Sequence, residues 1–165
     1  MRRPEVVAKS TSSAGRPAAP GVLDGTVGFH LARASVVAYA AFEEHIGAAY
    51  GLRKVDFSLL MLLDAHGSLP PKQLVRWLSL SAPKLSMVLE RMEAQGWIHR
   101  SPDAHDRRSV QVALSAEGLR LVRGLTPVAR RMEQGLKKRL GAADHATLIQ
   151  LLRKLADGTR PADGA

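Results

Sequence analysis

Apolar residues recur every three to five positions over residues 25–50, which is typical of one long helix with a single apolar stripe. Gly51 is expected to end it. The stretch FSLLMLLDAHG (57–67) predicts a shorter, buried helix closed by its final glycine. The two prolines of PPKQLVRWLSL predict the first turn of a short helix over 70–78. Three helices are therefore expected before residue 80.

The best-delimited helix of the chain lies in SAPKLSMVLERMEAQG (81–96). Ser81 can cap it, Pro83 fits its first turn, and Gly96 can take the left-handed position after its last turn. Its apolar face consists of Leu85, Val88, Leu89 and Met92. The opposite side carries Lys84, Met87 and Arg91 at spacings of three and four. This helix therefore has one face for the core and one that is polar and basic.

A short hairpin follows the helix. Trp97–Arg100 and Ser109–Leu114 have strand character, with an alternating apolar set in the second strand made of Val110, Val112 and Leu114. Turn-forming chemistry between the strands is supplied by Pro102, Asp103 and Ala104. The tip of the expected hairpin carries Asp106, Arg107 and Arg108.

Two helices are expected after the hairpin, over 116–140 with Ser115 as its cap and over 145–156, separated by a break from Gly141 to Asp144. Together with the helix over 25–50 they carry more apolar residues than the intervening domain can cover. This surplus predicts a homodimer formed through both ends of the chain, and a two-fold dimer needs a pseudo-palindromic site.

The charge and the composition of the chain favour some kinds of partner and exclude some kinds of site. Lys and Arg number 24 against 15 acids, a net charge of +9, which favours a polyanionic partner. The absence of cysteine excludes disulfides, thiolate metal sites and cysteine nucleophiles. Residues 1–21, rich in Ala, Ser, Pro and Gly, predict a flexible basic tail, and 157–165 a second flexible tail. With no signal peptide or apolar span visible, no membrane association and a cytoplasmic location are expected.

The order of these elements predicts a mainly α fold with a small β-hairpin wing: a winged helix-turn-helix with N- and C-terminal dimerisation helices. The domain would cover 22–156, with a DNA-binding core at about 55–115 and dimerisation through 25–50 and 116–156. A helix of this size fits the major groove of double-stranded DNA, and a thin basic loop fits the adjacent minor groove. Arg107 and Arg108 lie where the tip of such a loop needs them.

The run LERMEAQGWIHRSPDAHDRRSVQVALSAEG (89–118) resembles the MarR family of bacterial transcription regulators, with weaker similarity at VGFHLARA (27–34). The resemblance implies that Arg108 enters the minor groove and that Asp106 braces it. It also implies that five side chains lie on or near the DNA face: Ser81, Lys84, Ser86, Met87 and Arg91. Ser115 stands where the family usually has threonine, which keeps the capping hydroxyl.

Regulators of this kind commonly bind a small aromatic, anionic effector between the dimer helices and the winged domain. Here Phe29, His30 and Arg33 lie close together on the first helix, and Phe57 is a plausible neighbour. An arginine fork beside aromatic groups suits a ring carboxylate. The resemblance thus implies a repressor released from its operator by a small aromatic carboxylate, although Arg33 as a surface residue and His30 as an interfacial one is the plainer alternative.

The sequence gives little support for metal binding or for catalysis. The six histidines are scattered with no close-spaced ligand pair, so no metal and no cofactor is expected. No phosphate loop, nucleophile elbow or paired carboxylates are visible, so an enzyme is not expected. The alternative function is a winged-helix interaction protein that binds DNA non-specifically, or binds an RNA or protein partner.

Overall fold

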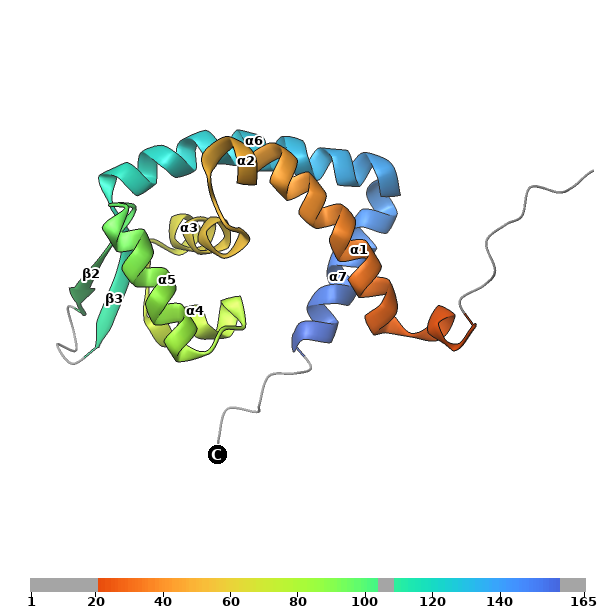
Figure 1. Cartoon of the computed structure of the whole chain (residues 1–165), viewed down its shortest axis with the longest axis horizontal. Helices are drawn as coiled ribbons and strands as arrows, with labels where there is room; N and C mark the ends of the chain where they lie inside the picture. The colour runs from red at the N-terminus through yellow and green to blue at the C-terminus, as the bar shows by residue number, and fades with distance from the viewer. Residues whose placement is uncertain (1–20, 104–108, 158–165) are drawn as a thin grey trace, which may run out of the picture. The chain divides into compact units, whose positions relative to one another are not determined.

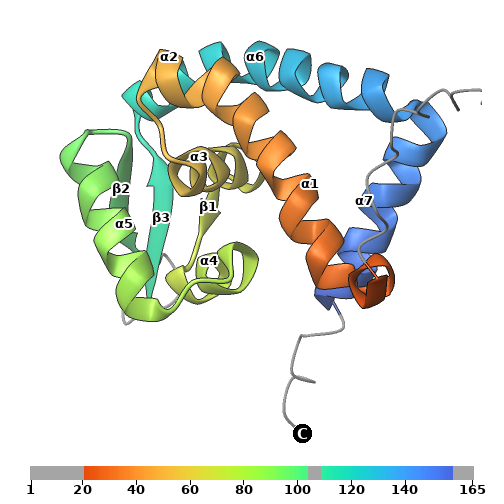
Figure 2. The same ribbon diagram turned by 45° about the vertical axis from the view of Figure 1, so that its right-hand side comes forward.

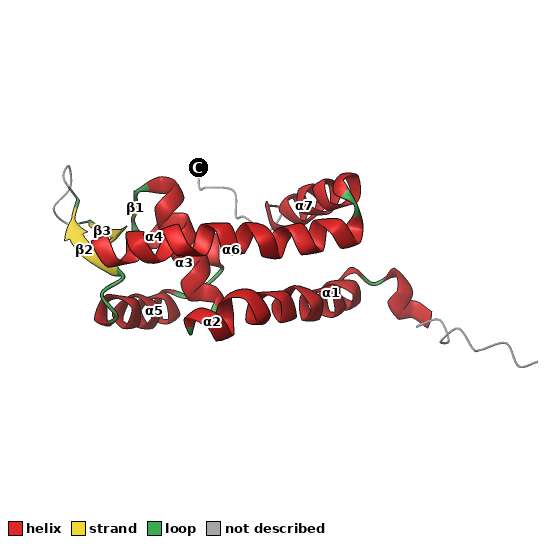
Figure 3. Cartoon of the chain, turned by 90° about the horizontal axis from the view of Figure 1, so that it is seen from above, coloured by secondary structure: helices red, strands yellow, loops and turns green. Residues whose placement is uncertain are grey.

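The structure is a computed structural model that describes residues 21–103 and 109–157. These residues are mostly helical, with one three-stranded antiparallel sheet (Figures 1 and 3). They form two compact units, residues 21–37 and residues 38–157. The first unit holds a 3-10 turn, η1 (Gly21–Gly25), and the first part of helix α1 (Val27–Phe42). The second holds everything that follows.

The helix expected over 25–50 is present as three consecutive parts. α1 passes directly into a π-helical turn, η2 (Glu43–Gly47), and then into α2 (Ala48–Tyr50). Gly51 ends the run in the left-handed conformation with φ 64°. The five-residue step from Ala41 to Ile46 in the apolar stripe falls on the π turn, and a turn of this kind adds one residue to the helix.

α3 (Lys54–His66) begins three residues before the predicted start and is closed by Gly67 with φ 79°. Its first turn is stabilised by Asp56, whose Oδ2 accepts a hydrogen bond from the Arg53 N–H at 3.3 Å. Strand β1 (Ser68–Leu69), α4 (Pro71–Leu78) and α5 (Ala82–Ala94) follow. α4 and α5 confirm their predictions. Ser81 stands at the N-cap position of α5, although its hydroxyl makes no capping hydrogen bond.

The sheet has the order β1-β3-β2, with β3 (Val110–Leu114) in the middle (Figure 2). β2 (Ile98–Pro102) pairs antiparallel with β3, from Ile98 opposite Leu114 to Pro102 opposite Val110. The predicted hairpin is confirmed, but Pro102 belongs to the strand rather than to the turn. Because β2 lies at the edge of the sheet, it tolerates a residue with no N–H to donate.

α6 (Ala116–Leu140) has the predicted range, and the Ser115 hydroxyl accepts a hydrogen bond from the Gly118 N–H at 3.0 Å. α7 (Ala142–Asp157) begins directly after Gly141, so the predicted four-residue break is wrong. Gly141, with φ 86°, ends α6 by itself. Asp144 then lies in the first turn of α7, where the helix dipole favours an acid.

The core of the second unit lies between α3, α5, α6 and the sheet. Its most deeply buried side chains are Ile46, Leu59, Leu60, Leu63, Leu74, Leu85, Met92, Val112, Val122 and Leu125. This core fixes α5 against α3 and the hairpin, and it leaves the outer side of α5 in solvent.

Candidate nucleic-acid interface

α4 and α5 are joined by a tight turn, residues 79–81. Ser79 adopts the left-handed conformation with φ 52° and donates its N–H to the Val75 carbonyl. The Leu80 N–H reaches the same carbonyl at 3.2 Å. Pro83 in the first turn of α5 then starts the second helix without losing a hydrogen bond. Two helices joined in this way form a helix-turn-helix, whose second helix is shaped for the major groove.

The outer side of α5 is exposed as predicted. Leu85, Val88, Leu89 and Met92 are buried, and the side chains of Ser81, Lys84, Ser86 and Met87 lie in solvent. Met87 is 67% exposed, which is unusual for a large apolar residue. This face therefore combines one cation, two hydroxyl groups and one thioether around an accessible helix surface.

Arg91 makes a contact that the sequence pattern does not reveal. Its guanidinium forms an ion pair with Asp56 of α3, which lies 35 residues earlier and is 3% exposed. A carboxylate this deeply buried needs a partner, because an unpaired charge is costly to remove from water. Arg91 therefore holds α5 against α3, while its own side chain remains about a third exposed.

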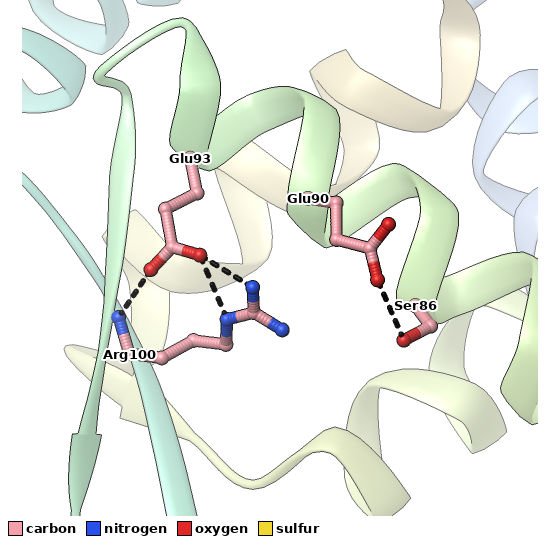
Figure 4. Close-up of polar contacts among 4 residues, drawn as sticks. All are labelled: Ser86, Glu90, Glu93 and Arg100. Atoms are coloured by element: carbon pink, nitrogen blue, oxygen red, sulfur yellow. Dashed lines mark hydrogen bonds and ion pairs between the residues drawn. The ribbon is translucent and has the colours of Figure 1, made fainter.

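A second ion pair joins α5 to the wing (Figure 4). The Glu93 carboxylate accepts hydrogen bonds from Arg100 Nε at 2.9 Å, from Arg100 Nη2, and from the Arg100 backbone N–H at 3.3 Å. The Arg100 side chain holds the pKa of the Glu93 carboxyl below its usual value, and Glu93 in turn raises the pKa of the Arg100 guanidinium. The last turn of α5 and β2 are thus tied together in the charged state.

Between α4, α5 and the two wing strands lies an open, mostly apolar hollow of about 480 Å³. Its wall includes Leu85, Leu89 and the paired Arg100. Ser86, also on this wall, donates its hydroxyl hydrogen to Glu90 at 3.4 Å (Figure 4). Glu90 places an acid on the exposed side of α5, a feature that the sequence analysis did not single out.

The wing tip lies outside the described residues, and Asp106, Arg107 and Arg108 belong to it. Hydrogen bonds join the two strands of the hairpin where the described residues end. The Asp103 N–H donates to the Ser109 carbonyl at 2.9 Å, and Gln111 Nε2 donates to Asp103 Oδ2 at 2.6 Å. The two strands are therefore joined by hydrogen bonds up to Asp103 and Ser109, the last described residues on either side.

The residues predicted to bind an effector divide between the two units. In the first unit, Arg33 lies over the Phe29 ring, with its Cζ 5.4 Å from the ring centroid, and Phe29 meets His30 edge to face at 5.4 Å. His30 Nε2 lies 2.7 Å from the Asp24 carbonyl oxygen. In the second unit, Phe57 packs edge to face on Phe42 at 5.7 Å. The structure thus brings Phe29, His30 and Arg33 together.

Within the described part of the chain, no three His, Asp or Glu side chains converge as a metal site would require. No helix in residues 21–103 and 109–157 combines the length and the apolarity needed to cross a membrane.

Comparisons with known proteins agree with this geometry. The MarR family model matches residues 52–110, which run from two residues before α3 to the first residue of β3. The multiple antibiotic resistance protein MarR of Salmonella typhimurium is 32% identical over 101 residues, covering 61% of this chain and 70% of that protein. This chain belongs to the MarR family. The winged helix-turn-helix fold and the family predicted from the sequence are both confirmed.

Two other MarR-like proteins are similar over more of the chain. The HTH-type transcriptional repressor NicR of Pseudomonas putida is 27% identical over 128 residues, or 78% of this chain and 81% of that protein. A solved structure of Bordetella bronchiseptica BpsR, concerned with regulation of its DNA binding by 6-hydroxynicotinic acid, has 29% identity and a TM-score of 0.74. It covers 84% of this chain and 99% of that one. The MarR-family relatives are transcription regulators rather than enzymes.

Proposed function

We propose that this protein is a dimeric, sequence-specific DNA-binding transcription regulator that represses its targets and is released by a small aromatic acid. The observation that carries the proposal is the exposed outer side of α5, a helix that one ion pair ties to α3 and a second ties to the wing hairpin, in a chain of the MarR family. Both pairs lie in the C-terminal part of α5, at Arg91 and Glu93, so this part of the helix is fixed before DNA binds.

In this proposal α5 reads the major groove of double-stranded DNA. Lys84 donates to guanine acceptors, the Ser81 and Ser86 hydroxyls bond to phosphate or base edges, and Met87 contacts apolar base surface. Arg91 contributes through the exposed part of its guanidinium. In the wing, Arg108 enters the minor groove, with Arg107 beside it and Asp106 as its brace. Major-groove contacts and the wing would together define one half-site.

Dimerisation supplies the second half-site. The outer side of α7 exposes a row of leucines, Leu148, Leu151, Leu152 and Leu155, that are between 38% and 58% accessible. An apolar row of this kind on a single helix is typical of an interface. A two-fold dimer built on it would bind a pseudo-palindromic operator with half-sites about 10 base pairs apart or a multiple of that spacing.

The effector part of the proposal is supported by the cluster in the first unit and by relatives. BpsR is regulated by 6-hydroxynicotinic acid, a pyridine carboxylate, and NicR is a repressor. In this chain Arg33 would hold such a carboxylate while Phe29 and His30 contact the ring. A ligand shifts an equilibrium only when its affinities for the two states differ. The aromatic acid must therefore bind the DNA-incompetent dimer more tightly than the DNA-competent one.

The DNA part is tested by salt titration of the purified protein on its operator and on random duplexes. Sequence-specific regulation predicts a preference of about 10³ or more for the operator at physiological salt. The alternative, an interaction protein with non-specific DNA affinity or an RNA or protein partner, predicts a ratio near unity.

The effector part is tested by isothermal titration with 6-hydroxynicotinic acid and related benzoates. Wild type should bind, Arg33→Ala should not, and Arg33→Lys should bind weakly, because lysine keeps the charge but lacks the planar fork. All three should bind the operator equally in ligand-free buffer. Absence of binding to wild type would refute the effector and leave the DNA result untouched.

A further inference from the structure

α6 carries a row of cations that neither the helix-turn-helix nor the wing uses. The buried residues of this helix are Gly118, Val122, Leu125 and Val128, and they face α3, η2 and β3. The cations on the other side are Arg120, Arg123, Arg130, Arg131, Lys137 and Lys138, and all six are exposed. At 3.6 residues per turn these six fall within one arc of about 120°, centred opposite the buried face. We call this arc the α6 basic face.

Acids do not compensate this charge. α6 holds seven Lys or Arg residues and two acids. Glu117 forms an ion pair with Arg120, and Glu133 with His145 of α7. Among the described residues, the remaining cations of the α6 basic face have no acidic partner. The helix therefore presents a single-sign surface of at least five free cations to solvent.

The other residues of the α6 basic face indicate the kind of polyanion it fits. Between Arg120 and Lys138 they are Pro127 and Gln134, with Gly124 at the edge of the arc, and all three are exposed. Leu119, 41% exposed, lies within the same arc directly before Arg120. The face has no aromatic side chain, which is the usual platform on which the unpaired bases of single-stranded nucleic acid stack. With Leu119 as its single large apolar side chain, it has too little apolar surface to insert into a bilayer as an amphipathic helix does. Cations that are separated by smaller side chains can closely approach the regularly spaced phosphates of a duplex.

The dimensions also match a duplex. Arg120 to Lys138 spans about 27 Å at 1.5 Å per residue, the length of about eight base pairs. We propose that the α6 basic face binds the phosphate backbone of a second DNA duplex, apart from the one bound by α5 and the wing, so that the protein bridges two DNA segments. Five phosphate contacts would give this second site a slope of about −4.5 in log K against log salt. The inference goes beyond the proposed function and does not depend on an operator or an effector.

A two-duplex capture experiment with the full chain tests it. A random-sequence duplex of about 30 base pairs is fixed to beads and saturated with protein, and a second, fluorescent random duplex is then added at low salt. The test variant is Arg123→Gln with Arg130→Gln. The matched control is Arg153→Gln with Lys154→Gln, which removes the same charge from exposed positions on α7.

Wild type and the α7 control should retain the fluorescent duplex. The α6 variant should bind the first duplex within about twofold of wild type but retain at least about tenfold less of the second, with a salt slope for capture smaller by about 1.8. The proposal is overturned if wild type captures no second duplex, if the α6 variant captures as much as wild type, or if both binding steps fall in parallel. Capture of single-stranded RNA or anionic vesicles in preference to the duplex would overturn it as well.

Discussion

Asp56 lies in the first turn of α3, where it accepts a hydrogen bond from the Arg53 N–H and pairs with Arg91 of α5. Removing the carboxylate charge would leave Arg91 beside a buried amide with no counter-charge. We expect Asp56→Asn to lower the free energy of unfolding by about 2–3 kcal/mol, the usual range for a lost charged hydrogen bond at a mostly buried site. Urea unfolding measures this directly.

Asp64→Asn is the matched control, because Asp64 lies on the same helix and is exposed. It should change stability by less than about 0.5 kcal/mol. Equal effects of the two substitutions would show that the Asp56–Arg91 pair does not hold α5 in place.

Gly118 and Gly124, both on α6, should respond to alanine in opposite directions. A Cβ at Gly118 would lie 2.0 Å from the Trp97 carbonyl oxygen, a backbone atom, whereas a Cβ at Gly124 meets nothing within 4 Å. Gly118→Ala should therefore destabilise the protein by about 1–3 kcal/mol or more. Gly124→Ala should stabilise it by up to about 1 kcal/mol, since alanine has the higher helix propensity. Thermal unfolding of both variants checks the signs, and a stable Gly118→Ala would contradict the close approach of α6 to the start of β2.

At the scale of elements, the Glu93–Arg100 pair ties α5 to the wing and should give stability a defined pH dependence. The pKa of Glu93 is lowered in the folded chain from its ordinary value of 4.5, so the contribution of the pair is complete above that value. It is lost as the pH falls through the lower folded value. The difference in unfolding free energy between wild type and Glu93→Gln should therefore be constant from pH 7 to pH 5 and shrink below pH 4. A difference that grows on acidification would contradict the pairing.

The elements could largely be predicted because their ends are marked by residues with specific chemistry. Ser81, Pro83 and Gly96 delimit α5, and Ser115 caps α6 through its hydroxyl. The predictions fail where the local residues carry little information about where an element begins or ends. β1 has two residues and no period, and Gly141 alone ends α6 where a longer break was expected.

Part of the candidate site could be predicted from the spacing of residues along one helix. Helical spacing suffices to put Lys84 and Met87 on the exposed side of α5. Helical spacing cannot reveal that Arg91, on the same side, forms an ion pair with Asp56, 35 residues earlier. Nor can it reveal that Glu93 of α5 accepts a hydrogen bond from Arg100 of β2. Those contacts depend on tertiary packing, which no single-helix pattern contains.

At the scale of the whole molecule, the exposed leucines of α7 predict an obligate dimer. Replacing Leu151 and Leu155 with aspartate should yield monomer or aggregate, because charges would then interrupt the apolar row. Sedimentation at several concentrations separates these states. Gln150→Asp, an exposed polar position on the same helix, is the control and should remain dimeric. A monomeric wild type, or a double variant that dimerises normally, would place the interface elsewhere.

We propose that this MarR-family chain recognises a particular DNA sequence. The most direct measurement is a footprint of the full-length protein on the DNA that flanks its own gene, at physiological salt. We expect a protected pseudo-palindrome whose half-sites lie about 10 base pairs apart, or a multiple of that distance, and whose protection survives a large excess of random duplex. Protection that is uniform along the fragment, or that vanishes with random competitor, would contradict it.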